Sequence, residues 1–184
     1  MLKRVRRKII AFCGFEKSGK DYSCQRLVTV KGFKKVAFAD ALRDISFTLL
    51  GYSTEDGMSH YEDLKKTELF NGLNFRNILE NLGSAIRKYD RDFWAKTVLY
   101  QIKELSPKNI CISDLRYKNE YNVLKKFCEA NDIEFKLVFC DYKSEDYNPN
   151  NPHESAKLAK YIKELGYRDQ EEVRDEDMLM YRGF

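Results

Sequence analysis

Four short runs along the chain are rich in apolar residues without a strict alternation of apolar and polar positions. They cover Lys8–Cys13, Val36–Ala39, Asn109–Ser113 and Phe135–Cys140. A strand covered on both faces has no polar face, so such runs are typical of a buried parallel sheet. The pattern predicts four strands.

Helical periodicity fills the sequence between these runs. The clearest helix has Phe75, Ile78, Leu79, Leu82 and Ile86 in one apolar stripe. A second helix is predicted at Ala41–Leu50, with Asp40 as its N-cap and Gly51 as the residue that ends it. The predicted helices are Asp21–Thr29, Ala41–Leu50, Glu62–Phe70, Asn74–Lys88, Asp92–Leu105, Asn119–Ala130 and Ser155–Leu165.

Alternating strands and helices predict a three-layer α/β/α fold with a central parallel sheet. We expect one domain over residues 1–184. Its middle part, residues 41–105, has no strand pattern and is expected to be a helical insertion that caps the carboxyl edge of the sheet, where ligands bind in such folds. Residues 142–152 are polar and contain proline, so they are a candidate lid loop.

The loop after the first predicted strand fits G-x-x-x-x-G-K, from Gly14 to Lys20. Strand, glycine-bounded loop and helix start are the context of a phosphate-binding loop, whose backbone N–H groups converge on phosphate oxygens. The alternative is a chance Gly-Lys turn. Asp21 follows the lysine, where most such loops carry the Ser or Thr that holds magnesium.

Two further strand ends carry polar side chains toward the same edge. Asp114 follows the third apolar run and could hold magnesium, and Arg116 could bind a phosphate with its planar fork. The alternative is that Asp114 caps a turn and Arg116 pairs at the surface. Asp40 could bind a sugar hydroxyl or a base edge and Arg43 a phosphate, with a plain N-cap as the alternative.

The predicted helix Asn74–Lys88 carries Arg76, Glu80, Gly83 and Arg87 on one face. One arginine could bind the acceptor phosphate and the other the phosphate donor. The alternative is a charged face that is simply exposed to solvent. A glycine within a helix often marks a close approach by another element. Trp94, nearby in sequence, is expected in the core.

Composition limits the partners and the cellular compartment that we expect for the protein. The net charge of +4 is mild. A basic cluster lies at residues 3–8, but no second basic stretch with interspersed aromatic residues accompanies it, so nucleic-acid binding is not expected. Five cysteines without a C-x-x-C pair are expected to be buried thiols in a reducing compartment. No apolar run has membrane-spanning length, so we expect a cytoplasmic protein with no membrane partner.

Several segments together resemble the bacteriophage-type deoxynucleoside monophosphate kinases, a group similar to the animal-type phosphomevalonate kinases. The resemblance covers about residues 8–140 and rests on K-S-G-K-D at 17–21, F-A-D-A-L-R at 38–43, the Arg76–Arg87 face, D-F-W at 92–94 and S-D-L-R-Y-K-N-E at 113–120. Tyr22 matches the phosphomevalonate branch, whereas the 113–120 segment favours the phage branch.

The resemblance implies a P-loop NTPase fold and transfer of the ATP γ-phosphate to a deoxynucleoside monophosphate. ATP and Mg²⁺ would be the cofactors and small nucleotides the partners, with a monomer or homodimer as the assembly. The implied catalytic residues are Lys20, Arg87 and Arg116. The implied binding residues are Gly14, Lys17, Ser18, Gly19, Lys20, Asp21 and Tyr22 for ATP, Asp40, Arg43, Arg76, Arg87 and Arg116 for the acceptor, and Asp21 and Asp114 for the metal.

Two other functions stay open from the sequence. One is a kinase for another small phosphate such as phosphomevalonate, which Tyr22 favours. The other is a nucleotide-binding module without catalysis, which is favoured by a candidate lid that contains Lys143 and no arginine.

Overall fold

The computed structural model describes residues 6–14, 18–106, 108–140 and Leu158. Its centre is a parallel sheet in the order β2-β5-β1-β6. Strand β1 (Lys8–Gly14) lies between β5 (Ile110–Ile112) and β6 (Glu134–Cys140), and β2 (Lys34–Val36) pairs with the other edge of β5. The four predicted strands and their parallel arrangement are confirmed.

Strand β2 begins and ends earlier than the predicted Val36–Ala39. Beyond Val36 the backbone N–H of Ala37 donates to Asp40, and the next two N–H groups, those of Phe38 and Ala39, donate to Asp114. Because these donors bond to carboxylates, they are not available for a sheet ladder. The apolar run therefore continues past the strand that it predicts.

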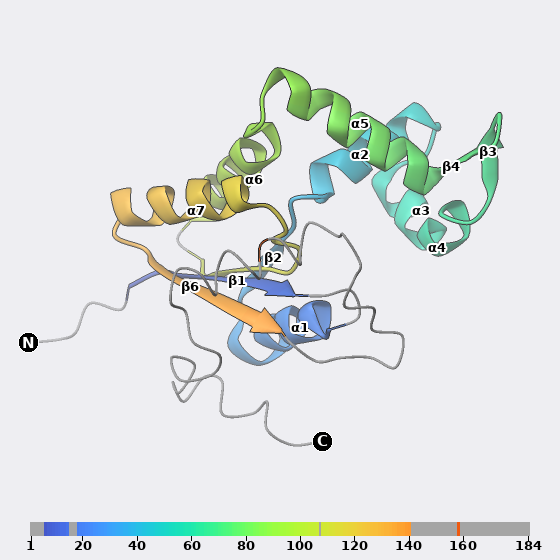
Figure 1. Cartoon of the computed structure of the whole chain (residues 1–184). Helices are drawn as coiled ribbons and strands as arrows, with labels where there is room; N and C mark the ends of the chain where they lie inside the picture. The colour runs from blue at the N-terminus through green and yellow to red at the C-terminus, as the bar shows by residue number, and fades with distance from the viewer. Residues whose placement is uncertain (1–5, 15–17, 107, 141–157, 159–184) are drawn as a thin grey trace, which may run out of the picture.

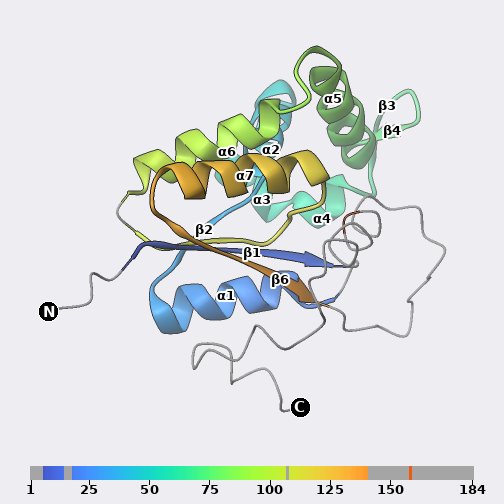
Figure 2. The same ribbon diagram turned by 60° about the vertical axis from the view of Figure 1, so that its left-hand side comes forward.

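Alternate residues of β1 enter two different cores. Ile9 and Ala11 belong to the larger core under helices α6 (Phe93–Glu104) and α7 (Lys118–Ala130). Ile10 and Phe12 pack on the opposite face, in the core shared with helix α1 (Lys20–Lys31). Figures 1 and 2 show α1 on one face of the sheet and α6 and α7 on the other. The molecule thus has the three α/β/α layers that the sequence predicts.

The remaining elements form a group on the side toward which the strands point (Figures 1 and 2). This group has its own small core of Phe47, Leu64 and Phe75, in which the two phenylalanine rings stack with centroids 4.8 Å apart. Its elements are α2 (Asp40–Leu49), α3 (Thr54–Ser59), α4 (Tyr61–Leu64), β3 (Glu68–Phe70), β4 (Leu73–Asn74) and α5 (Phe75–Tyr89).

Two details of this region differ from the sequence prediction. The expected helix Glu62–Phe70 is wrong, because α4 ends at Leu64 and Glu68–Phe70 is a strand of a hairpin. Asn71 and Gly72 both have positive φ, 45° and 80°, which suits a tight hairpin turn. In addition, α6 lies within the expected insertion but packs in the main core through Ala95, Val98 and Ile102.

Part of the prediction cannot be compared with the structure. The candidate lid at 142–152, and all of the expected helix Ser155–Leu165 except Leu158, lie outside the described residues; Leu158 is buried in the main core. Among the helices that are described, none is long and apolar enough to cross a membrane.

Candidate active site

The phosphate loop joins β1 to α1 and places a lysine at its end. Gly14 has φ 139°, and a Cβ on it would lie 2.2 Å from the carbonyl oxygen of Cys140, so only glycine fits there. Helix α1 begins at Lys20, directly after Gly19 with φ 85°. The Lys20 Nζ donates to the Gly14 carbonyl at 3.1 Å and to the Ser18 Oγ at 3.4 Å. The ammonium thus turns back over the loop; Lys17 lies outside the described residues.

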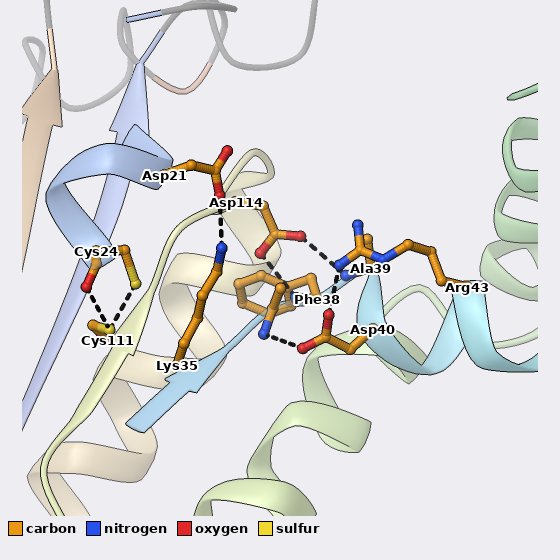
Figure 3. A network of polar contacts seen from close by, with 10 residues as sticks. Asp21, Cys24, Lys35, Phe38, Ala39, Asp40, Arg43, Cys111 and Asp114 are labelled. Atoms are coloured by element: carbon orange, nitrogen blue, oxygen red, sulfur yellow. Dashed lines mark hydrogen bonds and ion pairs between the residues drawn. The ribbon is translucent and has the colours of Figure 1, made fainter. Parts of the chain in front are cut away.

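At the start of α1, Asp21 lies beside a lysine from the neighbouring strand. The Lys35 Nζ donates to Asp21 Oδ1 at 2.9 Å (Figure 3). Partial burial acts to raise the pKa of Asp21, but hydrogen bonds from Lys35 and Ser113 outweigh it and hold that pKa below its ordinary value. The carboxylate therefore stays ionised, and most of its surface is open to solvent. Tyr22 is exposed at 64%.

Asp114 organises the turn between β2 and α2. Its Oδ1 accepts the N–H of Phe38 at 2.8 Å and its Oδ2 the N–H of Ala39 at 3.0 Å (Figure 3). Desolvation raises the pKa of Asp114, although these two hydrogen bonds and the charges of Arg116 and Arg43 act against that rise. The turn-capping alternative for Asp114 is therefore present in the structure. A metal at this carboxylate would have to share its oxygens with the turn.

Asp40 has a different local role from the predicted N-cap. It is the first residue of α2, and Ala39 is the N-cap. The Asp40 Oδ2 instead accepts the N–H of Ala37 at 2.8 Å, while Oδ1 pairs with Arg43 at 2.5 Å. The Arg43 guanidinium also lies over the Tyr61 ring, 5.8 Å from its centroid. Asp40 thus positions Arg43 at the edge where the strands end.

Three cations act on the same small region. Arg43 and Arg116 both influence the pKa of Asp114 through their charges, and the charge of Arg116 also acts on Lys20. Desolvation is the larger influence on Lys20 and lowers its pKa, with Arg116 acting in the same direction. Arg43 is already paired with Asp40, whereas the charges of Arg116 and Lys20 repel each other, and a bound anion would relieve that repulsion. The arrangement is suited to binding phosphate groups.

The 116–120 segment connects this region to helix α5. Glu120, only 2% exposed, accepts the N–H groups of Arg116 and Tyr117, each at 3.0 Å. Arg87 Nη2 lies 3.6 Å from the other Glu120 oxygen, and its guanidinium is 4.3 Å from the centroid of the Tyr117 ring. Asn119 Nδ2 donates to the carbonyl of Arg91 before α6.

Only part of the α5 face that carries the two arginines contacts the rest of the site. Arg87 joins the 116–120 segment, whereas Arg76 forms an exposed pair with Glu80 at 3.0 Å, as the solvated-face alternative expects. Gly83 does mark a close approach, because a Cβ there would lie 3.1 Å from Leu42 Cδ2. Trp94 is buried as predicted, and its Nε1 donates to the Gly83 carbonyl at 3.2 Å.

Some residues of the site were not identified from the sequence. Lys35 stands in a strand with no motif around it, and Tyr61 lies just before the helix predicted at Glu62–Phe70 and outside every predicted element. Glu120 was part of the 113–120 motif, yet its role as acceptor for two backbone N–H groups and neighbour of Arg87 depends on the fold.

The described residues contain no cluster of three or more His, Cys, Asp or Glu that could hold a metal ion. Mg²⁺ nevertheless needs few protein ligands when it is shared with phosphates, since one or two carboxylates and several waters suffice. Asp21 fits that requirement best because it is ionised, exposed and next to Lys20.

Two solved structures show a distant likeness to this chain. No protein-family model matches the chain, and no curated protein matches it significantly. Among solved structures, an APS kinase from Mycobacterium tuberculosis is 16% identical over 89% of this chain and 99% of its own, with a TM-score of 0.41. A gluconokinase from Sinorhizobium meliloti is 15% identical over 74% of this chain and 58% of its own, with a TM-score of 0.38. Both superpositions are loose.

Proposed function

We propose that this protein is an ATP-dependent kinase whose acceptor is a phosphate group, and more narrowly the phosphate of a deoxynucleoside monophosphate. The observation that carries the proposal is that Arg43, paired with Asp40, and Arg116 both act through their charges on Asp114, while Arg116 also acts on Lys20 at the end of the phosphate loop. A donor triphosphate needs the loop and Lys20. A neutral acceptor would not need the additional positive charges of Arg43 and Arg116, whereas an anionic acceptor such as a phosphate would bind to them.

The proposed chemistry needs positioning and charge neutralisation more than proton transfer. An acceptor phosphate is already an anionic nucleophile, so no general base is required. Lys20 would neutralise the outer phosphates of ATP, and Arg43 and Arg116 would hold the acceptor in line. Asp21 would hold Mg²⁺, which supplies further neutralisation of the phosphate charge when it is bound.

Helix α5 and the aromatic residues near it support a role for the insertion in acceptor binding. Arg43 is fixed between Asp40 and the Tyr61 ring, and Arg87 between Glu120 and the Tyr117 ring. Arginines held by two partners lose less conformational entropy when they bind a phosphate. The deoxynucleoside part of the proposal rests on the resemblance of the 113–120 and 38–43 segments.

The test is a panel of phosphate acceptors with ATP and Mg²⁺, read out as ADP formed above the rate without acceptor. The panel holds the four common deoxynucleoside monophosphates, their ribose counterparts and phosphomevalonate, with Lys20→Ala as the matched control. Turnover with a deoxynucleoside monophosphate, lost in the control, is expected. Turnover only with phosphomevalonate would favour the other kinase branch, and ATP binding without any turnover would favour the binding module.

A further inference from the structure

Two cysteines from separate elements meet in the core between α1 and the sheet. Cys24 lies on α1, one turn after Lys20, and Cys111 is the middle residue of β5. The Cys24 thiol donates to the Cys111 sulfur, with the two Sγ atoms 2.6 Å apart (Figure 3). This separation is only ~0.6 Å longer than a disulfide bond.

The fold explains why these two sulfurs face one another. Neighbouring residues of a strand point to opposite faces, so Cys111 points toward α1 while Ile110 and Ile112 point into the core under α6 and α7. Cys24 and Leu27 lie on the face of α1 that packs against the sheet. Both cysteines are fully buried free thiols in this structure.

We propose that Cys24 and Cys111 are a covalent modification site, at which a peroxide oxidises the two thiols to a disulfide that ties α1 to the central strand β5. The inference is independent of the proposed kinase function, because it requires only the facing sulfurs. The bridge would nevertheless lie close to the candidate active site, since α1 carries Lys20 and Asp21, and β5 leads to Asp114.

The reaction balances with hydrogen peroxide as the only co-reactant. The Cys111 thiolate attacks one peroxide oxygen, which gives a sulfenic acid at Cys111 and hydroxide, and the proton released by the Cys111 thiol converts that hydroxide into one water. The Cys24 sulfur then attacks the Cys111 sulfur and displaces that oxygen as a second water. The two thiols together lose two electrons and two protons. The hydrogen bond from Cys24 lowers the pKa of Cys111, which favours Cys111 as the attacking thiolate.

The other cysteines provide an internal comparison. Cys13 on β1 and Cys140 on β6 belong to adjacent strands, where Gly14 is the register partner of Cys140. Burial, with Cys140 acting in the same direction, raises the pKa of Cys13 to about 12, so its thiol is a poor nucleophile. Cys128 is buried in the other core, among residues of α6 and α7. We therefore expect a disulfide between Cys24 and Cys111 and not between the other cysteines.

The experiment treats the full chain with hydrogen peroxide at low concentration, blocks the remaining thiols and maps disulfide-linked peptides by mass spectrometry. We expect a monomer lighter by two hydrogen atoms, with the Cys24 and Cys111 peptides linked. Addition of a dithiol reductant should restore the original mass. A link between Cys13 and Cys140, a mixture of links, or sulfinic acid at Cys111 without a link would each overturn the proposal.

Variants and thermal melting give a second test. Cys24→Ala and Cys111→Ala should each abolish the loss of two hydrogens, whereas Cys128→Ala should retain it. Because the bridge spans 87 positions along the chain, the oxidised wild type should melt about 5–10 °C above the reduced form. An oxidised protein that melts at or below the temperature of the reduced one would contradict a bridge that fits the native structure. The wild-type peptide map decides the question even if a variant fails to fold.

Discussion

Glu120 should make the stability of this protein depend on pH in a direction opposite to that of most carboxylates. Desolvation raises its pKa to about 7 from an ordinary 4.5, even though two backbone N–H groups and Arg87 act in the other direction. A carboxyl group whose folded pKa is raised holds its proton more tightly in the native state. Its contribution to stability is therefore fully present below about pH 4.5 and is lost as the pH rises to about 7. The full difference in the free energy of unfolding is about 3 kcal/mol.

The substitution Glu120→Gln isolates this contribution, because glutamine keeps an oxygen acceptor and cannot ionise. We would measure the free energy of unfolding by urea at about pH 4.5, 6 and 8 for wild type and variant. Relative to wild type, the variant should gain about 3 kcal/mol between the lowest and the highest pH. Glu80→Gln, at an exposed pair with Arg76, should show a nearly constant difference.

Two results would refute this reasoning. A constant difference between Glu120→Gln and wild type would mean that burial and the favourable partners cancel at Glu120. A variant that loses stability relative to wild type as the pH rises would mean that the N–H groups of Arg116 and Tyr117, together with Arg87, dominate. Glu120 would then be a stabilising anion with a lowered pKa.

The other predictions concern phosphoryl transfer and use the ADP assay together with thermal melting. Lys20→Ala should abolish transfer and leave the melting temperature nearly unchanged, because the ammonium acts on the outer phosphates; equal turnover would contradict the phosphate-loop assignment. Asp114→Asn should destabilise the fold by about 1–3 kcal/mol, since an amide cannot accept both backbone N–H groups, and should raise the magnesium requirement. An unchanged magnesium dependence would limit Asp114 to holding the turn. Arg116→Lys should lower kcat/KM, because lysine keeps the charge without the planar fork, and an unchanged value for every acceptor would remove Arg116 from the site. Arg87→Ala should lower kcat about a hundredfold and Lys143→Ala less than about tenfold, and the reverse order would assign the main charge to the candidate lid.

The sheet could be predicted from the sequence because its signal is local. Strands such as β1 are buried on both faces, so their apolar runs are unbroken, and the glycines that bound the phosphate loop are required by backbone conformation. The hairpin β3–β4 also had a local signal in Asn71-Gly72, a preferred hairpin turn. The prediction of a helix at Glu62–Phe70 did not take that turn into account.

The contacts of the site could not be predicted in the same way, because they join residues far apart in the chain. Asp114 bonds to the backbone of Phe38, 76 positions away. Such a contact depends on the order of strands in the sheet, and β2 and β5 become neighbours only in the folded sheet. Sequence position gives Asp114 a place at the strand end, but it cannot distinguish a metal ligand from a turn cap.

The segment from Asp114 to Glu120 links parts of the molecule that a kinase would have to move together. Asp114 holds the turn before α2, Asn119 holds the turn before α6, and Glu120 lies beside Arg87 of α5. If an acceptor phosphate engages Arg87, part of the positive charge that stabilises ionised Glu120 is taken up by the phosphate, and the pKa of Glu120 must rise further. Acceptor binding would then be coupled to proton uptake, and affinity would fall as the pH rises above the pKa of Glu120 in the free protein. This coupling gives the buried carboxylate a functional consequence without direct contact with substrate, since it requires only that Arg87 be shared.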